Sequence, residues 1–140
     1  GAAVNVCDGR YSYFRYPTVS GADSLHEYTL MPTRMTARFS IRDLVGATLH
    51  PSFSFTKGVP VLKLDPKTDD EGRPVEVQGM GFEDWQSALY DLEADPGQTT
   101  PLNNPEIERY LCQQLTENMA MLDAPYEAYR RFGLQAPLET

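Results

Sequence analysis

Hydrophobic and polar positions alternate near the start of the chain and take a helical spacing near its end. Two β-prone runs within residues 3–16 flank an Asp8-Gly9 pair, which favours a type I′ hairpin turn. With Asp8-Gly9 as the loop, Val6 pairs with Tyr11, and each run places alternate side chains on one side. The register predicts an apolar sheet face made by Val4, Val6, Tyr11 and Tyr13.

Further short elements follow in the middle of the chain. Ser40 and Asp43 form a capping pair, which predicts one helical turn through Leu44 before Gly46 stops it. A charged segment over residues 65–74, which contains two Pro and one Gly, predicts an exposed loop. Extended segments are predicted over 25–31, over 53–64 with a break at Lys57-Gly58, and over 88–92.

Apolar residues recur at helical spacing from Ile107 to Leu122. Asn104 is a good N-cap and Pro105 a good first residue, so the spacing predicts a long helix that begins there. A second short helix is predicted over 125–132, with Gly133 as its stop. The element order predicts an α+β fold, in which a small antiparallel sheet of about four strands carries a C-terminal helix on one face.

Composition narrows the class of protein. A chain of 140 residues is expected to form one domain with a core. The net charge of −8 argues against nucleic acid as a partner, because phosphate binding needs clustered Lys and Arg. The chain has no apolar run of about 20 residues, so no membrane span is expected. Cys7 and Cys112 have no metal-ligand spacing, and we expect two unpaired, partly buried thiols.

Few residues could carry catalysis. The sequence has no Gly-rich phosphate loop, no Ser nucleophile elbow and no His-Glu-x-x-His motif, and its imidazoles are His26 and His50. His50 precedes Pro51 and is favoured as a loop histidine, with a ligand-facing role as the alternative. Lys57 lies beside a flexible Gly between two extended pieces. A solvated loop is favoured there, and contact with an anionic substrate is the alternative.

Two segments resemble one family. Residues 4–13 (VNVCDGRYSY) resemble the strand pair that opens the C-terminal subdomain of sulfatases of the alkaline-phosphatase superfamily. Residues 89–98 (LYDLEADPGQ) resemble the segment that ends the sheet of that subdomain and leads into its last helix. Residues 27–35 and 53–58 look like a bacterial branch of the same family. The order and spacing fit from about residue 3 to residue 132.

The resemblance implies that residues 1–140 are a sulfatase C-terminal subdomain, a fragment without its catalytic domain. It implies a non-catalytic part of a hydrolase for sulfuric, phosphoric or phosphonic esters, which packs on the catalytic domain and shapes the substrate cleft. Thr56, Lys57 and His50 are then the candidates to face a substrate anion. Contacts between subunits of a homo-oligomer are also implied.

The family's chemistry lies outside this chain. Sulfatases convert a Cys or Ser in a Cys/Ser-x-Pro-x-Arg motif to formylglycine and bind a divalent cation, expected to be calcium, in the absent domain. Neither Cys7 nor Cys112 matches that motif. We therefore expect no catalytic residue, no metal ligand and no cofactor in this chain, and no activity from the isolated chain.

Two other interpretations remain. A free-standing module with the same sheet-plus-helix fold would bind a protein partner and would be monodisperse without a catalytic domain. An enzyme complete in these residues is disfavoured, because two scattered histidines offer no paired nucleophile. The sequence leaves the ester and the oligomeric state open; for the cellular compartment it gives only a slight preference for the cytoplasm.

Overall fold

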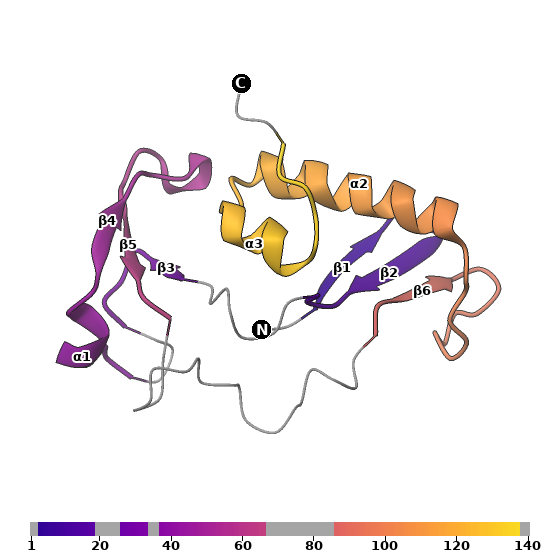
Figure 1. The fold of residues 1–140 in the computed structure, drawn as a ribbon, viewed down its shortest axis with the longest axis horizontal. Helices are drawn as coiled ribbons and strands as arrows, with labels where there is room; N and C mark the ends of the chain where they lie inside the picture. The colour runs from indigo at the N-terminus through magenta and orange to yellow at the C-terminus, as the bar shows by residue number, and fades with distance from the viewer. Residues whose placement is uncertain (1–2, 19–25, 34–36, 67–85, 138–140) are drawn as a thin grey trace. The chain divides into compact units, whose positions relative to one another are not determined.

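The computed structural model describes residues 3–18, 26–33, 37–66 and 86–137. The chain divides into two compact units. Unit 1 comprises Gly1–Ser20 and Val77–Thr140, and unit 2 comprises Gly21–Glu76. Each unit contains a small antiparallel sheet (Figure 1). The α+β class predicted from the element order is confirmed.

The sheet of unit 1 has the strand order β1-β2-β6. It is made of β1 (Val4–Cys7), β2 (Tyr11–Arg15) and β6 (Ala88–Asp91), all antiparallel. The central strand β2 joins two parts of the chain that lie more than 70 residues apart, since Tyr13 pairs with Leu89. Beyond β6, Leu102 bridges back to Leu89. The strand predicted over 88–92 is therefore confirmed.

The hairpin turn differs from its prediction. Val6 pairs with Tyr13 and not with Tyr11, so the register is shifted by two residues. The Asp8 carboxylate accepts the backbone N–H groups of Arg10 and Tyr11 at 2.9 and 2.7 Å, which closes the turn one residue later than expected. Gly9 alone in the turn has a positive φ, of 104°, whereas a type I′ turn needs two such residues.

The predicted apolar face is present in spite of the two-residue shift in register. Side chains alternate with a period of two, so a slip of two residues returns each of them to the same side of the sheet. Val6 and Tyr13 are core residues, and Val4 and Tyr11 pack against the same core. The face is therefore confirmed although the pairs that form it were wrong.

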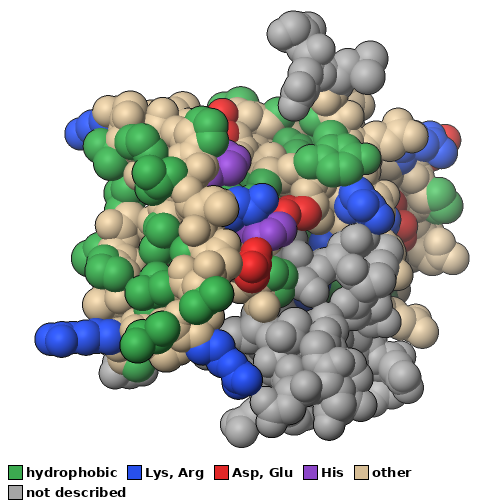
Figure 2. All heavy atoms as spheres, turned by 60° about the vertical axis from the view of Figure 1, so that its left-hand side comes forward, with side chains coloured by type: hydrophobic (Ala, Val, Ile, Leu, Met, Phe, Trp, Pro, Cys, Tyr) green, Lys and Arg blue, Asp and Glu red, His purple; other side chains and the backbone are tan. Residues whose placement is uncertain are grey.

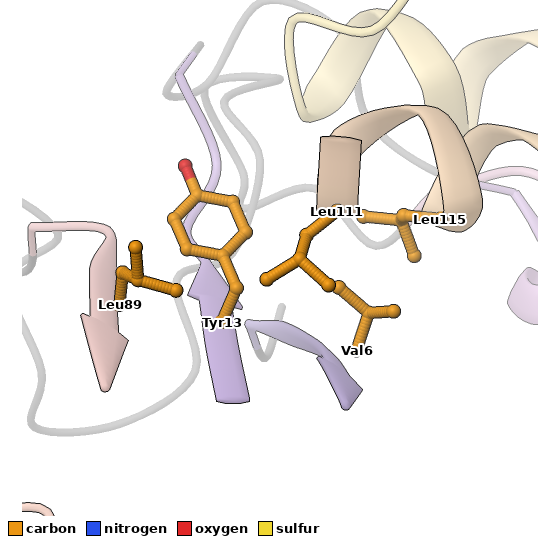
Figure 3. Close-up of a cluster of buried hydrophobic side chains, with 5 residues drawn as sticks. All are labelled: Val6, Tyr13, Leu89, Leu111 and Leu115. Carbon is orange, nitrogen blue, oxygen red and sulfur yellow. The ribbon is translucent and has the colours of Figure 1, made fainter. Parts of the chain in front are cut away.

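The long helix α2 (Pro105–Met121) covers this face. It begins where the sequence predicts, because the Asn104 side chain accepts the N–H groups of Glu106 and Ile107 at 3.2 and 3.3 Å. Leu111 is 0% exposed and points from α2 toward the sheet (Figure 3). The central core cluster consists of Val6, Tyr13, Leu89, Leu111 and Leu115.

The short helix α3 (Tyr126–Arg131) closes unit 1. The carbonyls at its end are capped from the last residue of β2 and from the segment that follows this strand. Arg15 Nε donates to the Phe132 carbonyl and the Thr18 N–H donates to the Arg131 carbonyl, both at 2.9 Å. Gly133 follows with φ of 60°, the left-handed conformation that ends many helices. The second helix and its glycine stop are thus confirmed.

Unit 2 has the strand order β3-β5-β4. Its elements are β3 (Glu27–Thr29), α1 (Ile41–Leu44), β4 (Thr48–His50), the 3-10 helix η1 (Ser54–Thr56) and β5 (Val61–Leu64). The helical turn after Ser40 is confirmed with its capping box, in which Ser40 and Asp43 bond reciprocally. The extended piece predicted after residue 53 is wrong at its start, because residues 54–56 form η1.

The single sheet of about four strands is corrected, for the residues that the structure describes, to two sheets of three strands each. Unit 2 lies in sequence between β2 and β6, and its short strands pair with one another, which a count of strands along the chain could not reveal. The loop predicted over 65–74 falls outside the described residues beyond residue 66. No described helix is long and apolar enough to cross a membrane.

Both thiols are free. Cys112 lies half-buried on α2, as predicted, but Cys7 is exposed. The reason is its place at the end of strand β1, which has a neighbour on one side only, next to the hairpin turn. There the Gly9 N–H donates to its Sγ at 3.4 Å.

Candidate functional site

A stack of aromatic rings lies in unit 2. His50, at the end of β4, stacks on Phe53 with 5.2 Å between ring centroids and 27° between the planes. Phe53 in turn stacks on Phe55 at 5.4 Å and 9°. We call His50, Phe53 and Phe55 the ring ladder. Tyr28 of β3 meets the edges of the first two rings at 5.1 and 5.4 Å.

The ring ladder runs from the interior of unit 2 to its surface. Phe53 is buried and His50 is partly buried, whereas Phe55 is 63% exposed. Figure 2 shows one face of the molecule, on which hydrophobic side chains lie near histidine, basic and acidic side chains. Because a phenyl ring has no hydrogen-bonding group, the exposed Phe55 side chain offers stacking and apolar contact.

Thr56 holds the turn after the ladder. Its hydroxyl lies 2.9 Å from the carbonyls of Phe53 and Val59, and its own N–H donates to the Phe53 carbonyl at 2.9 Å. The side chain is buried. The hydroxyl therefore ties both sides of the turn together, and this structural use is what the described contacts show for Thr56. Its predicted role toward a substrate stays a prediction.

Lys57 follows directly and is exposed. It has φ of 53° and ψ of 42°, the left-handed region that costs a residue with a Cβ about 1 kcal/mol or more. Gly58 also has a positive φ, of 81°. The break that the sequence predicts at Lys57-Gly58 is thus a tight turn, in which a lysine stands where glycine would be free of strain.

The two histidines of unit 2 have different neighbours. The ring of His50 has Nδ1 2.8 Å from the Pro51 carbonyl, so this nitrogen donates and Nε2 is the acceptor in the neutral ring. His26 Nε2 lies 3.8 Å from an Asp65 carboxylate oxygen. The polar contacts described for the two imidazoles are thus with a backbone carbonyl and with a carboxylate.

The structure connects the three predicted cleft residues through Phe53. The ring of Phe53 stacks on His50 and its carbonyl holds Thr56, which precedes Lys57. Sequence reasoning missed the aromatic members of the site, Tyr28, Phe53 and Phe55. The alternation of Phe and Ser in residues 52–55 was the available signal, and it was interpreted as a strand.

A second cluster joins the two segments on which the family resemblance rests. Arg10 donates from Nη2 and Nε to Asp91 Oδ2 at 2.9 and 3.3 Å, and Glu93 lies 3.5 Å from Arg10 Nε. Its guanidinium also lies 5.0 Å from the ring centre of Tyr11. The hydrogen bond from Arg10 lowers the pKa of Asp91, and Asp91 raises that of Arg10. This cluster fixes the hairpin turn to β6.

The loop after β6 is held by Asp95. Its carboxylate accepts the N–H groups of Thr99 and Thr100, both at 2.7 Å, and the Thr99 hydroxyl at 3.1 Å. The hydrogen bond from Thr100 is the main reason why the pKa of Asp95 is lowered. The acidic groups in this part of the chain therefore stabilise turns and an ion pair.

Possible metal ligands do not gather in the described part of the chain. Within the described ranges, no three His, Cys, Asp or Glu side chains come together in a group that could hold an ion. The cation and the formylglycine implied by the resemblance are assigned to a domain outside this chain, and they stay predictions. Comparisons with protein-family models, with curated proteins and with solved structures found no match for this chain.

Proposed function

We propose that this chain is the non-catalytic C-terminal subdomain of a sulfatase-type ester hydrolase. Its role is to pack on the catalytic domain and to form one wall of the substrate cleft. The substrate class is a sulfuric ester, or a phosphoric or phosphonic one, and the reacting groups belong to the catalytic domain. The proposal rests on the sequence resemblance and on the way the resembling segments pair in space.

The pairing of β2 with β6 is the observation that carries the proposal. Residues 4–13 and 89–98, which resemble the family in sequence, are far apart along the chain. In unit 1 they are neighbours, because Tyr13 pairs with Leu89 and Arg10 binds Asp91. Helix α2 covers the shared face. A chance likeness of two separate segments would not require them to build one sheet beneath one helix.

The surface of unit 2 supports docking on a larger body. Ile41, Val45 and Leu49 are 85%, 81% and 76% exposed. Ile41 and Val45 are four residues apart at α1, so they lie on one side of it. Large exposed apolar patches mark interaction surfaces. A free-standing module would be expected to keep such side chains covered, so this surface favours the docked subdomain.

The decisive test is made on the complete protein that contains this chain. Its remaining sequence is expected to hold a Cys/Ser-x-Pro-x-Arg motif and clustered aspartates. The purified protein, matured to carry formylglycine, is expected to hydrolyse aryl sulfate, and the isolated chain is expected to show no turnover. A gene without such a catalytic domain, or turnover by the isolated chain that a chelator abolishes, would refute the proposal.

Lys57 offers a finer test of the cleft wall. In the complete enzyme Lys57→Ala is expected to raise KM for an anionic ester with little change in kcat, because the lysine is assigned to binding alone. Lys63→Ala is the control, since Lys63 lies 5.9 Å from the Tyr28 ring centre and is assigned to that contact. If Lys57→Ala left the kinetics unchanged, Lys57 would have no place in the cleft wall. The proposed docking on the catalytic domain would not be affected by that result.

A further inference from the structure

The ring ladder ends in an aromatic face with nothing stacked on it among the described residues. Phe55 lies parallel to Phe53, with 9° between the planes, and is nevertheless 63% exposed. One face of its ring is therefore against Phe53 and the other is open. Stacking on Phe53 thus sets the plane of the Phe55 ring while its outer face meets solvent.

The turn beside this ring is held in one shape. The Thr56 hydroxyl ties the carbonyls on its two sides, and Val59 N–H donates to the Thr56 carbonyl at 3.0 Å. Lys57 occupies a left-handed conformation in this turn, at a cost that glycine would avoid. Backbone strain of this kind often accompanies a function that needs the side chain. The lysine stem is long enough to bring its ammonium near the ring two residues earlier.

We infer that Phe55 and Lys57 form a recognition site for a planar aromatic ring that carries an anionic group. The inference rests on the proposed function, and it names the part of the ester that unit 2 would contact. The open face of Phe55 would stack on the ring, and the Lys57 ammonium would lie near the anion. His50 and Phe53 would hold Phe55 in place from behind.

The chemistry of the site favours a flat ring over a sugar or an alkyl chain. Parallel stacking rewards a planar ring over its whole face. A sugar would need hydrogen-bonding groups for its hydroxyls, and Phe55 has none. An alkyl ester would gain only apolar contact. The charge of Lys57 then selects ligands with a negative group over neutral rings.

The test is a titration of the full 140-residue chain, followed by its amide NMR shifts, with naphthyl sulfate as the probe. Shifts are expected to concentrate in residues 53–59. Naphthol, which lacks the anion, and cyclohexyl sulfate, which lacks the flat ring, are each expected to bind more weakly. AMP also joins a planar ring to an anion; binding as tight as naphthyl sulfate would support the site but assign it to nucleotides and not to aryl esters.

Three variants sharpen the test. Phe55→Leu keeps apolar bulk but removes the aromatic face, and should weaken naphthyl sulfate binding by about fivefold or more. Phe55→Tyr should restore it. Lys57→Asn removes the charge with a residue that tolerates the left-handed conformation, and should weaken binding about two- to fivefold, by less at high ionic strength. Lys63→Gln is the control and should leave binding unchanged.

Equal binding by cyclohexyl sulfate, shifts centred away from residues 53–59, or undiminished binding by Phe55→Leu would each overturn the inference. The dispersion of the spectra reports whether each variant is folded. These outcomes do not bear on the sulfatase assignment, because ester turnover by the complete protein tests that separately. Failure of the ligand site and failure of the proposed function can therefore be told apart.

Discussion

The two units of this chain differ in how they bury their apolar side chains. Unit 1 brings a long helix onto a three-stranded sheet, and its central residues Leu111, Tyr13 and Leu89 are at most 1% exposed. The described part of unit 2 has a sheet of similar size but only one-turn helices, and Ile41, Val45 and Leu49 lie largely in water. The contrast teaches that a long helix lets unit 1 bury the apolar face of its sheet, whereas the one-turn helix α1 of unit 2 leaves its own apolar side chains in water.

The largest effect is expected in the core of unit 1. Leu111→Ala should lower the free energy of unfolding by about 2–5 kcal/mol, because it truncates an α2 side chain that is 0% exposed against the sheet. Urea unfolding followed by far-UV circular dichroism measures the change. Ile41→Ala, at a site 85% exposed, is the matched control and should change stability by less than about 0.5 kcal/mol. Equal losses of unfolding free energy in the two variants would contradict the difference between the units.

A smaller loss is expected where α3 ends. Gly133 has φ of 60°, and a Cβ there would lie 2.8 Å from Thr18 Oγ1 and 3.3 Å from an Arg15 guanidinium nitrogen. Gly133→Ala should destabilise the protein by about 1–2 kcal/mol through backbone strain and crowding. Gly97→Ala, whose nearest neighbours lie at 3.5 Å or more, is the control. A shift of the thermal midpoint with Gly97→Ala alone would contradict the capping role of Gly133.

The acidic turns of unit 1 predict a dependence on pH. The pKa values of Asp91 and Asp95 lie below the ordinary 3.8, through the hydrogen bonds from Arg10 and Thr100. A carboxyl with a lowered folded pKa stabilises the fold above its unfolded pKa and loses that contribution as pH falls through the folded pKa. The thermal midpoint of unfolding should therefore decrease as the pH is lowered below about 4.

Asp91→Asn should reduce this acid sensitivity and lower the midpoint near neutral pH. Glu93→Gln is its control, because Glu93 is the more exposed and more distant partner of Arg10. The same pH profile in wild type and Asp91→Asn would show that the ion pair contributes nothing to the attachment of the hairpin turn to β6.

The smallest effect on stability is expected at the surface of unit 2, where the readout is association. Ile41→Lys and Val45→Lys should leave the free energy of unfolding within about 0.5 kcal/mol of wild type. Light scattering should show less self-association of the isolated chain, since the charges interrupt an exposed apolar surface. On the proposed docking, the same changes in the complete protein should weaken the packing of unit 2 and raise its sensitivity to protease. A monodisperse wild-type chain would favour the free-standing module.

The local elements were largely determined by the sequence alone. The N-cap Asn104 with Pro105, the capping pair Ser40 and Asp43, and the stop at Gly133 act within one or two turns of chain, so their residues suffice to predict them. The apolar face of the first hairpin was also predictable, because alternation fixes sides even when the pairing slips by two residues.

Only the tertiary structure decided what pairs across distance. It placed the central part of the chain in a sheet of its own, set β6 beside β2, and brought Arg10 to Asp91. It also stacked Phe55 on Phe53 beside Thr56 and Lys57, where the sequence indicated an extended strand. Such contacts depend on the simultaneous packing of many side chains from distant segments, and no short window of sequence contains that information.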